Sequence, residues 1–205
     1  MGFYSRHIAP GLVDFACGAK PIAYQRRKLI PQASGVVLEI GAGGGRNFAL
    51  YDREKVSRLI ALEPEAGMIR RGRERTPEGL SVEWLEHGAE TAGLAPASLD
   101  TIVTTYTLCT IPDAIDALAA LRPALKPDGK LLFCEHGLAP DAGVVKWQRR
   151  IEPIWRPIAG GCHLTRDVEA LISAAGWRID HAERMYLPGT PQWAGYNVWG
   201  SARAT

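Results

Sequence analysis

The sequence predicts an α/β fold built on a doubly wound, mostly parallel sheet of seven strands, with one antiparallel strand late in the chain. Short apolar runs rich in β-branched residues alternate with segments in which apolar residues recur every three or four positions. Such strand–helix alternation implies right-handed βαβ units, and therefore a parallel sheet with helices on both faces. The last two runs are joined by a short segment that contains proline and glycine, which makes these two strands antiparallel.

Each expected strand is an apolar run bounded by turn residues, and the strands cover residues 36–40, 58–62, 80–85, 99–105, 130–135, 177–186 and 193–202. The glycine-rich segment after the first strand is expected to lead into a helix. Further helices are expected over 64–75, 112–125 and 165–176. Pro112 suits a first helical turn, Thr165 is the expected N-cap of the last helix, and Gly176 is its expected end.

Length and charge describe an ordinary globular chain. It has 205 residues, of which 46% are hydrophobic and 22% are charged, and this length suits a single domain. Lysine and arginine total 24 against 22 acidic residues, a formal net charge of +2. This balance argues against a nucleic-acid-binding protein.

The four cysteines are Cys17, Cys109, Cys134 and Cys162, and no two of them form a CxxC pair. We therefore expect free thiols, with neither a zinc site nor a disulfide framework. The first residues carry charge and proline where a signal peptide needs an apolar stretch. The apolar runs are also shorter than the about 20 residues that span a bilayer, so a cytoplasmic location is expected.

The glycine-rich segment after the first strand carries the main functional signal. It reads Glu39-x-Gly41-x-Gly43-x-Gly45, and the next residue is Arg46 where a dinucleotide-binding loop requires its third glycine. The spacing resembles that of the class I S-adenosylmethionine-dependent methyltransferases. S-adenosylmethionine has no phosphate, and the Glu39 carboxylate suits the ammonium group of its methionine part.

The resemblance continues in order through residues 36–135 and implies the class I methyltransferase fold, with S-adenosylmethionine as cofactor and S-adenosylhomocysteine as product. Glu63-Pro64 ends the second strand where the family binds the ribose hydroxyls, although the family more often has Asp there. Residues 87–90 match the loop at the adenine edge, and residues 98–103 and 121–129 match the fourth strand and the entry to the fifth. The cofactor-binding residues implied in this way are Glu39, Gly41, Ala42, Gly43, Gly45, Asn47, Glu63, Pro64, Met68, Gly88, Ala89, Glu90, Thr105 and Tyr106.

Three further segments resemble one branch of this family, the methyltransferase-like thiol S-methyltransferases. They are residues 107–110, 135–137 and 161–166. The branch implies S-methylation of a small thiol or sulfide. It includes animal membrane-associated enzymes with an N-terminal hydrophobic anchor, and we expect neither such an anchor nor residence at a lipid surface for this chain. We accordingly expect an N-terminal cap or lid over residues 1–33, a cofactor-binding half over 34–138, and substrate-side helices with a final β-hairpin over 139–205.

Ligands of such sheets lie outside the carboxyl ends of the strands. The residues at and just past the ends of the fourth and fifth strands, 105–109 and 135–136, are therefore expected to face the methyl group. Among them Thr107, Cys109, Glu135 and His136 are the substrate-side and catalytic candidates. His136 either acts as the base that uncovers the nucleophile or is structural. Cys109 and Cys162 either line the pocket or pack as small apolar residues.

The remaining substrate-side candidates are Tyr4, His7, Trp147, His163 and Trp193. Tyr4 and His7 either form a lid or pack on the surface, and the tryptophans line an apolar pocket or the core. The basic clusters at residues 26–28 and 70–75 are expected on exposed helices, where peripheral membrane contact is an alternative to simple solvation. The expected partner is a small methyl acceptor for a monomer or homodimer. A phospholipid headgroup amine, a quinone-type carbon and a non-catalytic cofactor-binding role are the alternatives.

Overall fold

A computed structural model describes residue 11, residue 14 and residues 16–89 and 92–205. Tyr4, His7 and Glu90 lie outside the described residues, and so does most of the expected cap or lid before residue 16.

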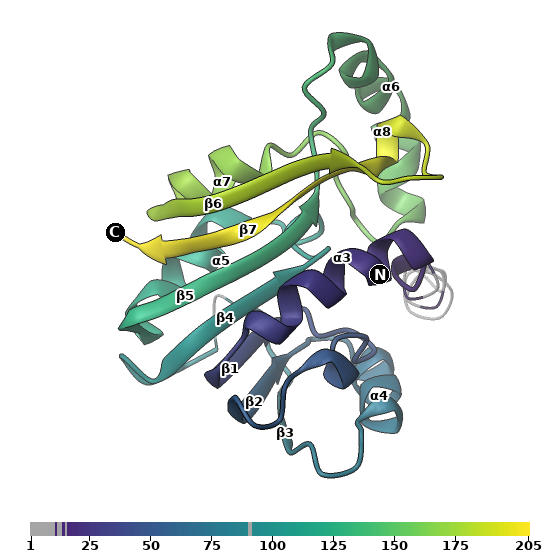
Figure 1. Cartoon of the computed structure of the whole chain (residues 1–205). Coiled ribbons are helices and arrows are strands. Elements are labelled where there is room, and N and C mark those ends of the chain that lie inside the picture. Colours follow the sequence, from purple (N-terminus) through teal and green to yellow (C-terminus); the bar gives the residue numbers. More distant parts are fainter. Residues whose placement is uncertain (1–10, 12–13, 15, 90–91) are drawn as a thin grey trace.

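Seven strands form one sheet in the order β3-β2-β1-β4-β5-β7-β6 (Figure 1). Strands β1 to β5 pair in parallel wherever they are neighbours. Strand β7 is antiparallel to both β5 and β6, as the sequence predicts. The strands are β1 (Gly35–Ile40), β2 (Val56–Leu62), β3 (Val82–Leu85), β4 (Leu99–Thr105), β5 (Leu125–His136), β6 (Trp177–Tyr186) and β7 (Tyr196–Ala204).

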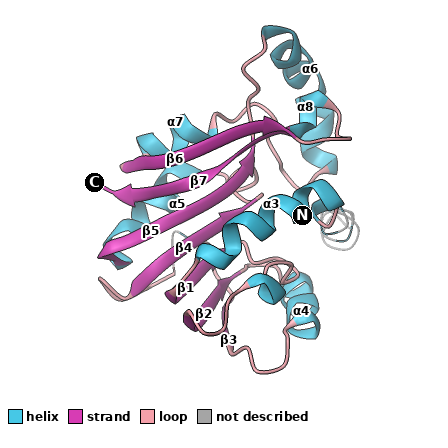
Figure 2. Cartoon of the chain, viewed as in Figure 1, coloured by secondary structure: helices cyan, strands magenta, loops and turns pink. Residues whose placement is uncertain are grey.

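Helices cover both faces of the sheet (Figure 2). They are α3 (Lys20–Leu29), α4 (Ala66–Arg75), α5 (Ala114–Leu121), α6 (Ala142–Ile158), α7 (Val168–Ala174) and α8 (Gln192–Gly195). Alternate residues of β1 enter different cores, because successive side chains of a strand point to opposite faces. Leu38 packs in the core that includes α5 and α7, whereas Val37 packs in the core that includes Leu29 of α3.

The strand order places a topological switch point at β1. The chain passes from β1 to β2 on one side and returns to β4 on the other, and β1 pairs with both strands. A crevice therefore opens beyond the carboxyl ends of β1 and β4, where α/β sheets bind their ligands. The glycine-rich loop follows β1, and residues 105–110 follow β4 at the same edge.

Two expectations about local structure are wrong near the start of the chain. The glycine-rich loop leads only into a short 3₁₀ helix, Phe48–Leu50, and not into an α-helix. Asn47, which precedes it, is fully buried and bonded to neighbouring side chains rather than capping the helix. The cluster at residues 26–28 is not simply an exposed helix face, because Arg26 is buried and donates a hydrogen bond to Asn47.

Two other expectations are wrong near the end of the chain. Thr165 is not the N-cap of α7, because its backbone N–H and hydroxyl both donate to Glu152. Asp167 caps that helix instead, and its carboxylate accepts from the N–H of Ala170 at 3.0 Å. Trp193 belongs to α8, so the last strand begins later than expected, at Tyr196. Among the described residues, no helix is both long and apolar enough to cross a membrane.

Candidate functional site

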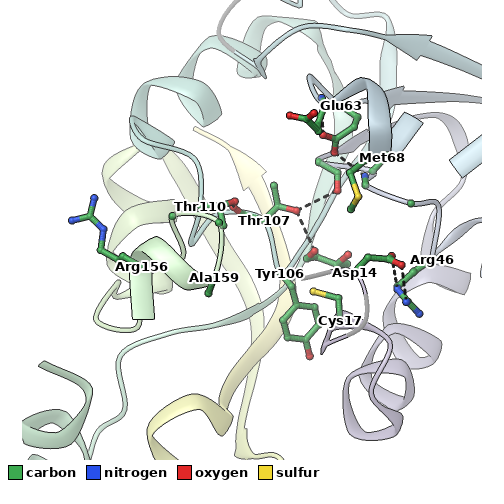
Figure 3. A pocket seen from close by; sticks show the side chains of 18 of the residues that line it. Asp14, Cys17, Arg46, Glu63, Met68, Tyr106, Thr107, Thr110, Arg156 and Ala159 are labelled. Carbon is green, nitrogen blue, oxygen red and sulfur yellow. Dashed lines mark hydrogen bonds and ion pairs between the residues drawn. The ribbon is translucent and has the colours of Figure 1, made fainter. Parts of the chain in front are cut away.

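A cavity of about 1000 Å³ lies at the carboxyl edge of the sheet (Figure 3). Its walls come from the loops after β1, β2 and β4, from the end of α6, and from the segment before α3. The lining residues are Asp14, Cys17, Arg26, Gly41, Ala42, Gly43, Gly44, Arg46, Glu63, Glu65, Met68, Thr105, Tyr106, Thr107, Thr110, Pro153, Arg156, Pro157, Ala159, Gly160 and Gly161.

The glycine-rich loop forms one wall because its backbone adopts conformations that favour glycine. Gly41 has φ +62° and Gly43 has φ +54°, both in the left-handed region. A Cβ atom on Gly41 would also collide with the side chain of Thr107. The loop after β1 and the loop after β4 therefore approach each other closely, and bare backbone faces the cavity.

Glu63 ends β2 and is 8% exposed at the cavity wall. One carboxylate oxygen accepts from the N–H of Gly43 at 2.9 Å, and the other accepts from the N–H of Glu65 at 3.0 Å. Burial raises the pKa of this carboxyl, and the two N–H donors act against that rise. Each oxygen has a second lone pair, so the side chain can accept from further donors such as a pair of hydroxyls.

Glu39 lies behind the glycine-rich loop and is not among the cavity-lining residues. Its two oxygens accept from Asn47 at 2.9 Å and from Tyr51 at 2.7 Å, and burial raises the pKa of the carboxyl to about 7. Asn47 also donates to Thr105 and accepts from Arg26, and both of these residues line the cavity. Glu39 thus braces the walls through Asn47, and its direct contact with a cofactor ammonium stays a prediction.

The loop after β4 is held by Glu135, which is fully buried. The carboxylate accepts from the hydroxyl of Thr104 and from the backbone N–H groups of Thr107 and Leu108. Burial raises the pKa of Glu135 to about 7. Tyr106 sits at the turn with φ +55°, an uncommon backbone conformation for a residue with a side chain. Glu135 therefore shapes this wall from behind, and it does not itself line the cavity.

Three cavity-lining residues were not among the site residues expected from the sequence. They are Asp14 and Cys17, which precede α3, and Arg46 in the glycine-rich loop. Asp14 accepts from Arg46 at 2.8 Å and also forms an ion pair with Arg75 of α4 (Figure 3 shows Asp14 and Arg46). These ion pairs tie the segment before α3 to the glycine loop. Arg46 follows the last glycine of the loop, where a dinucleotide-binding loop would have glycine. This departure is the one feature of the sequence that points to the ion pair between Arg46 and Asp14.

Cys109, His136 and Cys162 meet beside the cavity, although none of the three lines it. The Nε2 atom of His136 lies 3.0 Å from the Sγ atom of Cys162, and the indole N–H of Trp155 donates to the same sulfur at 3.3 Å. Hydrogen bonding from Cys109, aided by His136, lowers the pKa of the Cys162 thiol. The same hydrogen bond, with burial, raises the pKa of Cys109.

The two tryptophan candidates meet in a different place. Trp147 and Trp193 line a second hollow of about 410 Å³ between α6 and α8. Trp147 is 58% exposed, and the ring of Trp193 packs edge-on against Trp155 with centroids 5.3 Å apart. His163 lies outside both hollows, and its Nδ1 atom is 3.1 Å from Glu152.

The structure thus brings eight of the residues expected to bind cofactor or substrate to the wall of one cavity: Gly41, Ala42, Gly43, Glu63, Met68, Thr105, Tyr106 and Thr107. Six described cofactor candidates are not on that wall: Glu39, Gly45, Asn47, Pro64, Gly88 and Ala89. Pro64 is exposed to solvent. The cavity fits a nucleoside joined to an amino acid. Its volume suits a small-molecule ligand, its glycine backbone permits close approach, and Glu63 is a buried acceptor at the end of β2.

Comparisons with known proteins agree with this geometry. Residues 38–133 match the family model described as a methyltransferase domain. The chain is 31% identical to thiol S-methyltransferase TMT1B of Rattus norvegicus over 81% of this chain and 69% of the relative. It is 30% identical to human thiol S-methyltransferase TMT1B over 70% of this chain and 63% of that protein.

A solved structure extends the agreement to the fold. A SAM-dependent methyltransferase of Leishmania major superposes with a TM-score of 0.71 at 18% identity, and the match covers 98% of this chain and 80% of that one. The seven-stranded sheet with antiparallel β7 is thus shared along nearly the whole chain. The chain belongs to the class I S-adenosylmethionine-dependent methyltransferases, close to the thiol S-methyltransferase branch, and S-adenosylmethionine is its cofactor.

Proposed function

We propose that this methyltransferase acts on a small thiol or sulfide. One observation carries the proposal. The three segments that resemble the thiol branch, residues 107–110, 135–137 and 161–166, converge at the carboxyl edge of the sheet beside the cavity. The N–H of His163 donates to the carbonyl of Cys109 at 2.9 Å, and Arg166 donates to the carbonyls of Leu108 and Ile111. The segments that carry the resemblance to the thiol branch therefore lie together, beside the cavity.

A thiol acceptor also suits the chemistry of this wall. S-adenosylmethionine supplies an electrophilic methyl group on a sulfonium. A lone pair of the acceptor sulfur forms the new S–CH₃ bond as the old one breaks, and S-adenosylhomocysteine leaves. An ordinary thiol has a pKa near 8.5, so roughly a few per cent is thiolate at pH 7 and orientation matters more than a strong base. The cavity holds fixed backbone and the Asp14–Arg46 ion pair, which can orient ligands.

The test is acceptor turnover by the full chain with matched acceptors. The thiol acceptors are hydrogen sulfide, methanethiol and 2-mercaptoethanol. Two controls match 2-mercaptoethanol: ethylene glycol has a hydroxyl in place of the thiol, and ethanolamine has an amine in its place. Release of S-adenosylhomocysteine with the thiols and not with the matched alcohol or amine supports the proposal. Turnover confined to the amine, or to no acceptor while the cofactor binds, contradicts it.

A second candidate acceptor is a phospholipid headgroup amine or a quinone-type carbon, and α6 favours it. This helix exposes Trp147, Ile154 and Ile158 by 58%, 69% and 44%, and with Val144 and Ile151 they recur at three- and four-residue spacing. Lys146, Arg149, Arg150 and Arg156 lie on the same helix. An apolar stripe with basic neighbours is typical of helices that lie on anionic membranes.

Vesicles distinguish the two acceptors. The second candidate predicts that vesicles of anionic phospholipid raise turnover and that Ile154→Glu abolishes this rise. The matched control is Ile115→Glu on α5, which changes an isoleucine of 44% exposure in another helix. Thiol turnover that is indifferent to vesicles and to Ile154→Glu favours the thiol. A monomeric or homodimeric state and a cytoplasmic location remain part of the first proposal, and size-exclusion chromatography and cell fractionation test them.

A further inference from the structure

Three side chains of the kind that bind metals meet beside the cavity, and each comes from a different segment. The Sγ atoms of Cys109 and Cys162 and a ring nitrogen of His136 all lie within 4.8 Å of one another. Cys109 follows β4, His136 is the last residue of β5, and Cys162 follows α6. The backbone hydrogen bond from His163 to Cys109 holds the first and last of these segments together.

The three donors are shielded by apolar neighbours. Cys109 is 4% exposed and Cys162 is 7% exposed, and both pack with Ala159 and the half-buried Trp155. His136 is half-buried. A low-polarity shell strengthens binding of a cation by negatively charged sulfur, since the effective dielectric constant is lower there than in water.

We propose that Cys109, His136 and Cys162 form a Zn²⁺ site with an open fourth position. Two thiolates and an imidazole are the soft and borderline ligands that select zinc over magnesium or calcium. Each thiol loses its proton to the buffer on binding, and the imidazole binds through a nitrogen lone pair, so no oxidant or reductant takes part.

The fourth position is left to water or a ligand, because no fourth histidine, cysteine or acidic side chain among the described residues joins the cluster. Glu135 accepts from Thr104 and from two backbone N–H groups, and Glu152 accepts from Thr165 and pairs with His163. Among the described residues the cluster therefore contains three ligand side chains. Three protein ligands with an open position are typical of catalytic zinc sites, whereas structural sites have four.

The open position deepens the proposed function, and this step rests on that function. Zinc lowers the pKa of a coordinated thiol, so a substrate thiol that binds there loses its proton to the buffer and keeps a sulfur lone pair for methyl transfer. Ala159, Gly160 and Gly161 line the cavity immediately before Cys162, so the site and the cavity share one loop. Gly160 and Gly161 have φ +62° and +92°, which lets this loop turn back toward β5 after α6.

Cobalt titration tests the site without reference to methyl transfer. The full chain, freed of metal under a phosphine reductant, is titrated with Co²⁺ and then with Zn²⁺. We expect one equivalent of Co²⁺ to bind with thiolate-to-cobalt charge-transfer and tetrahedral visible bands, and Zn²⁺ to displace it. Loss of an outer hydrogen-bond partner already weakens metal binding about 10- to 100-fold, so Cys109→Ala and Cys162→Ala are each expected to weaken it about 100-fold or more.

Cys134→Ala is the matched control, because it also removes one fully buried thiol but lies outside the cluster. The affinity of Cys134→Ala for Co²⁺ is expected to stay within about twofold of wild type, since no metal ligand is lost. Circular dichroism verifies that each variant is folded. The wild-type chain gives a measurement that needs no variant: Zn²⁺ is expected to slow alkylation of Cys109 and Cys162, but not of Cys17, as read by peptide mass spectrometry.

Folded wild type without a cobalt–thiolate band would overturn the proposal, as would a band that survives in both Cys109→Ala and Cys162→Ala. Failure of the proposed function gives a different result. If the chain binds Co²⁺ through this cluster but methylates no thiol, the metal site stands and the proposed thiol acceptor is wrong.

Discussion

Removal of the Glu63 carboxylate is expected to weaken cofactor binding. The side chain is 8% exposed, and each oxygen already accepts one backbone N–H, which leaves one lone pair per oxygen for the ribose hydroxyls. Loss of a buried acceptor costs about 1–3 kcal/mol. That range corresponds to about a 5- to 150-fold increase in the dissociation constant for S-adenosylhomocysteine.

Isothermal titration calorimetry of Glu63→Ala with S-adenosylhomocysteine measures this change. Glu63→Asp keeps a carboxylate at shorter reach and is expected to fall between wild type and the alanine variant. Glu74→Ala, an exposed glutamate of α4, is the control for a change in net charge. The alanine variant also leaves the N–H of Gly43 without its acceptor, so urea unfolding is measured in parallel. A folded Glu63→Ala variant that binds as tightly as wild type would refute the assignment of Glu63 to the ribose.

Three further outcomes follow from the geometry. Gly41→Ala forces a side chain into a left-handed conformation and is expected to lower the free energy of unfolding by about 1–2 kcal/mol, whereas Gly143→Ala, in open space on α6, is not. Tyr51→Phe removes a donor to the buried carboxylate of β1 and is expected to cost about 1–3 kcal/mol in urea unfolding, unlike the exposed Tyr24→Phe. Burial raises the pKa of Glu135 from 4.5 to about 7, so the folded chain holds this proton more tightly than the unfolded chain does. The stability from this group is therefore full below pH 4.5 and is lost as pH rises to about 7, by about 3 kcal/mol, and Glu135→Gln is expected to flatten that part of the pH dependence. If the free energy of unfolding changes equally with pH between 4.5 and 7 in wild type and in Glu135→Gln, this expectation about Glu135 is wrong.

The sheet was predictable because its signals are local. Each parallel strand contains a short apolar run, since both faces of the sheet are covered. The antiparallel β7 follows from the short connection expected between residues 187 and 191. Element ends were less predictable, because tertiary contacts override local preference. Thr165 has the chemistry of an N-cap, but Glu152 of α6 takes both of its donors, and a carboxylate on another helix leaves no signal near residue 165.

The cofactor wall shows the same division between local and distant contacts. The places of Gly41, Gly43 and Glu63 at the cavity were predictable, because they follow the ends of β1 and β2 and the strand ends share one edge. The hydrogen bonds of Glu39 to Asn47 and Tyr51 were not predictable, because both residues reach it only after the loop folds back. A motif residue can therefore act on a cavity that it does not touch.

The cysteine–histidine cluster shows why a spacing rule fails on this fold. A CxxC pair presents two sulfurs from one turn, and its absence argues only against sites built that way. In a doubly wound sheet, residues that follow β4, β5 and a later helix reach the same edge however far apart they are in the sequence. Cys109, His136 and Cys162 meet for this reason, just as the glycine loop meets Thr107. For this fold, ligand groups are better sought among residues that follow strand ends than among residues close in sequence.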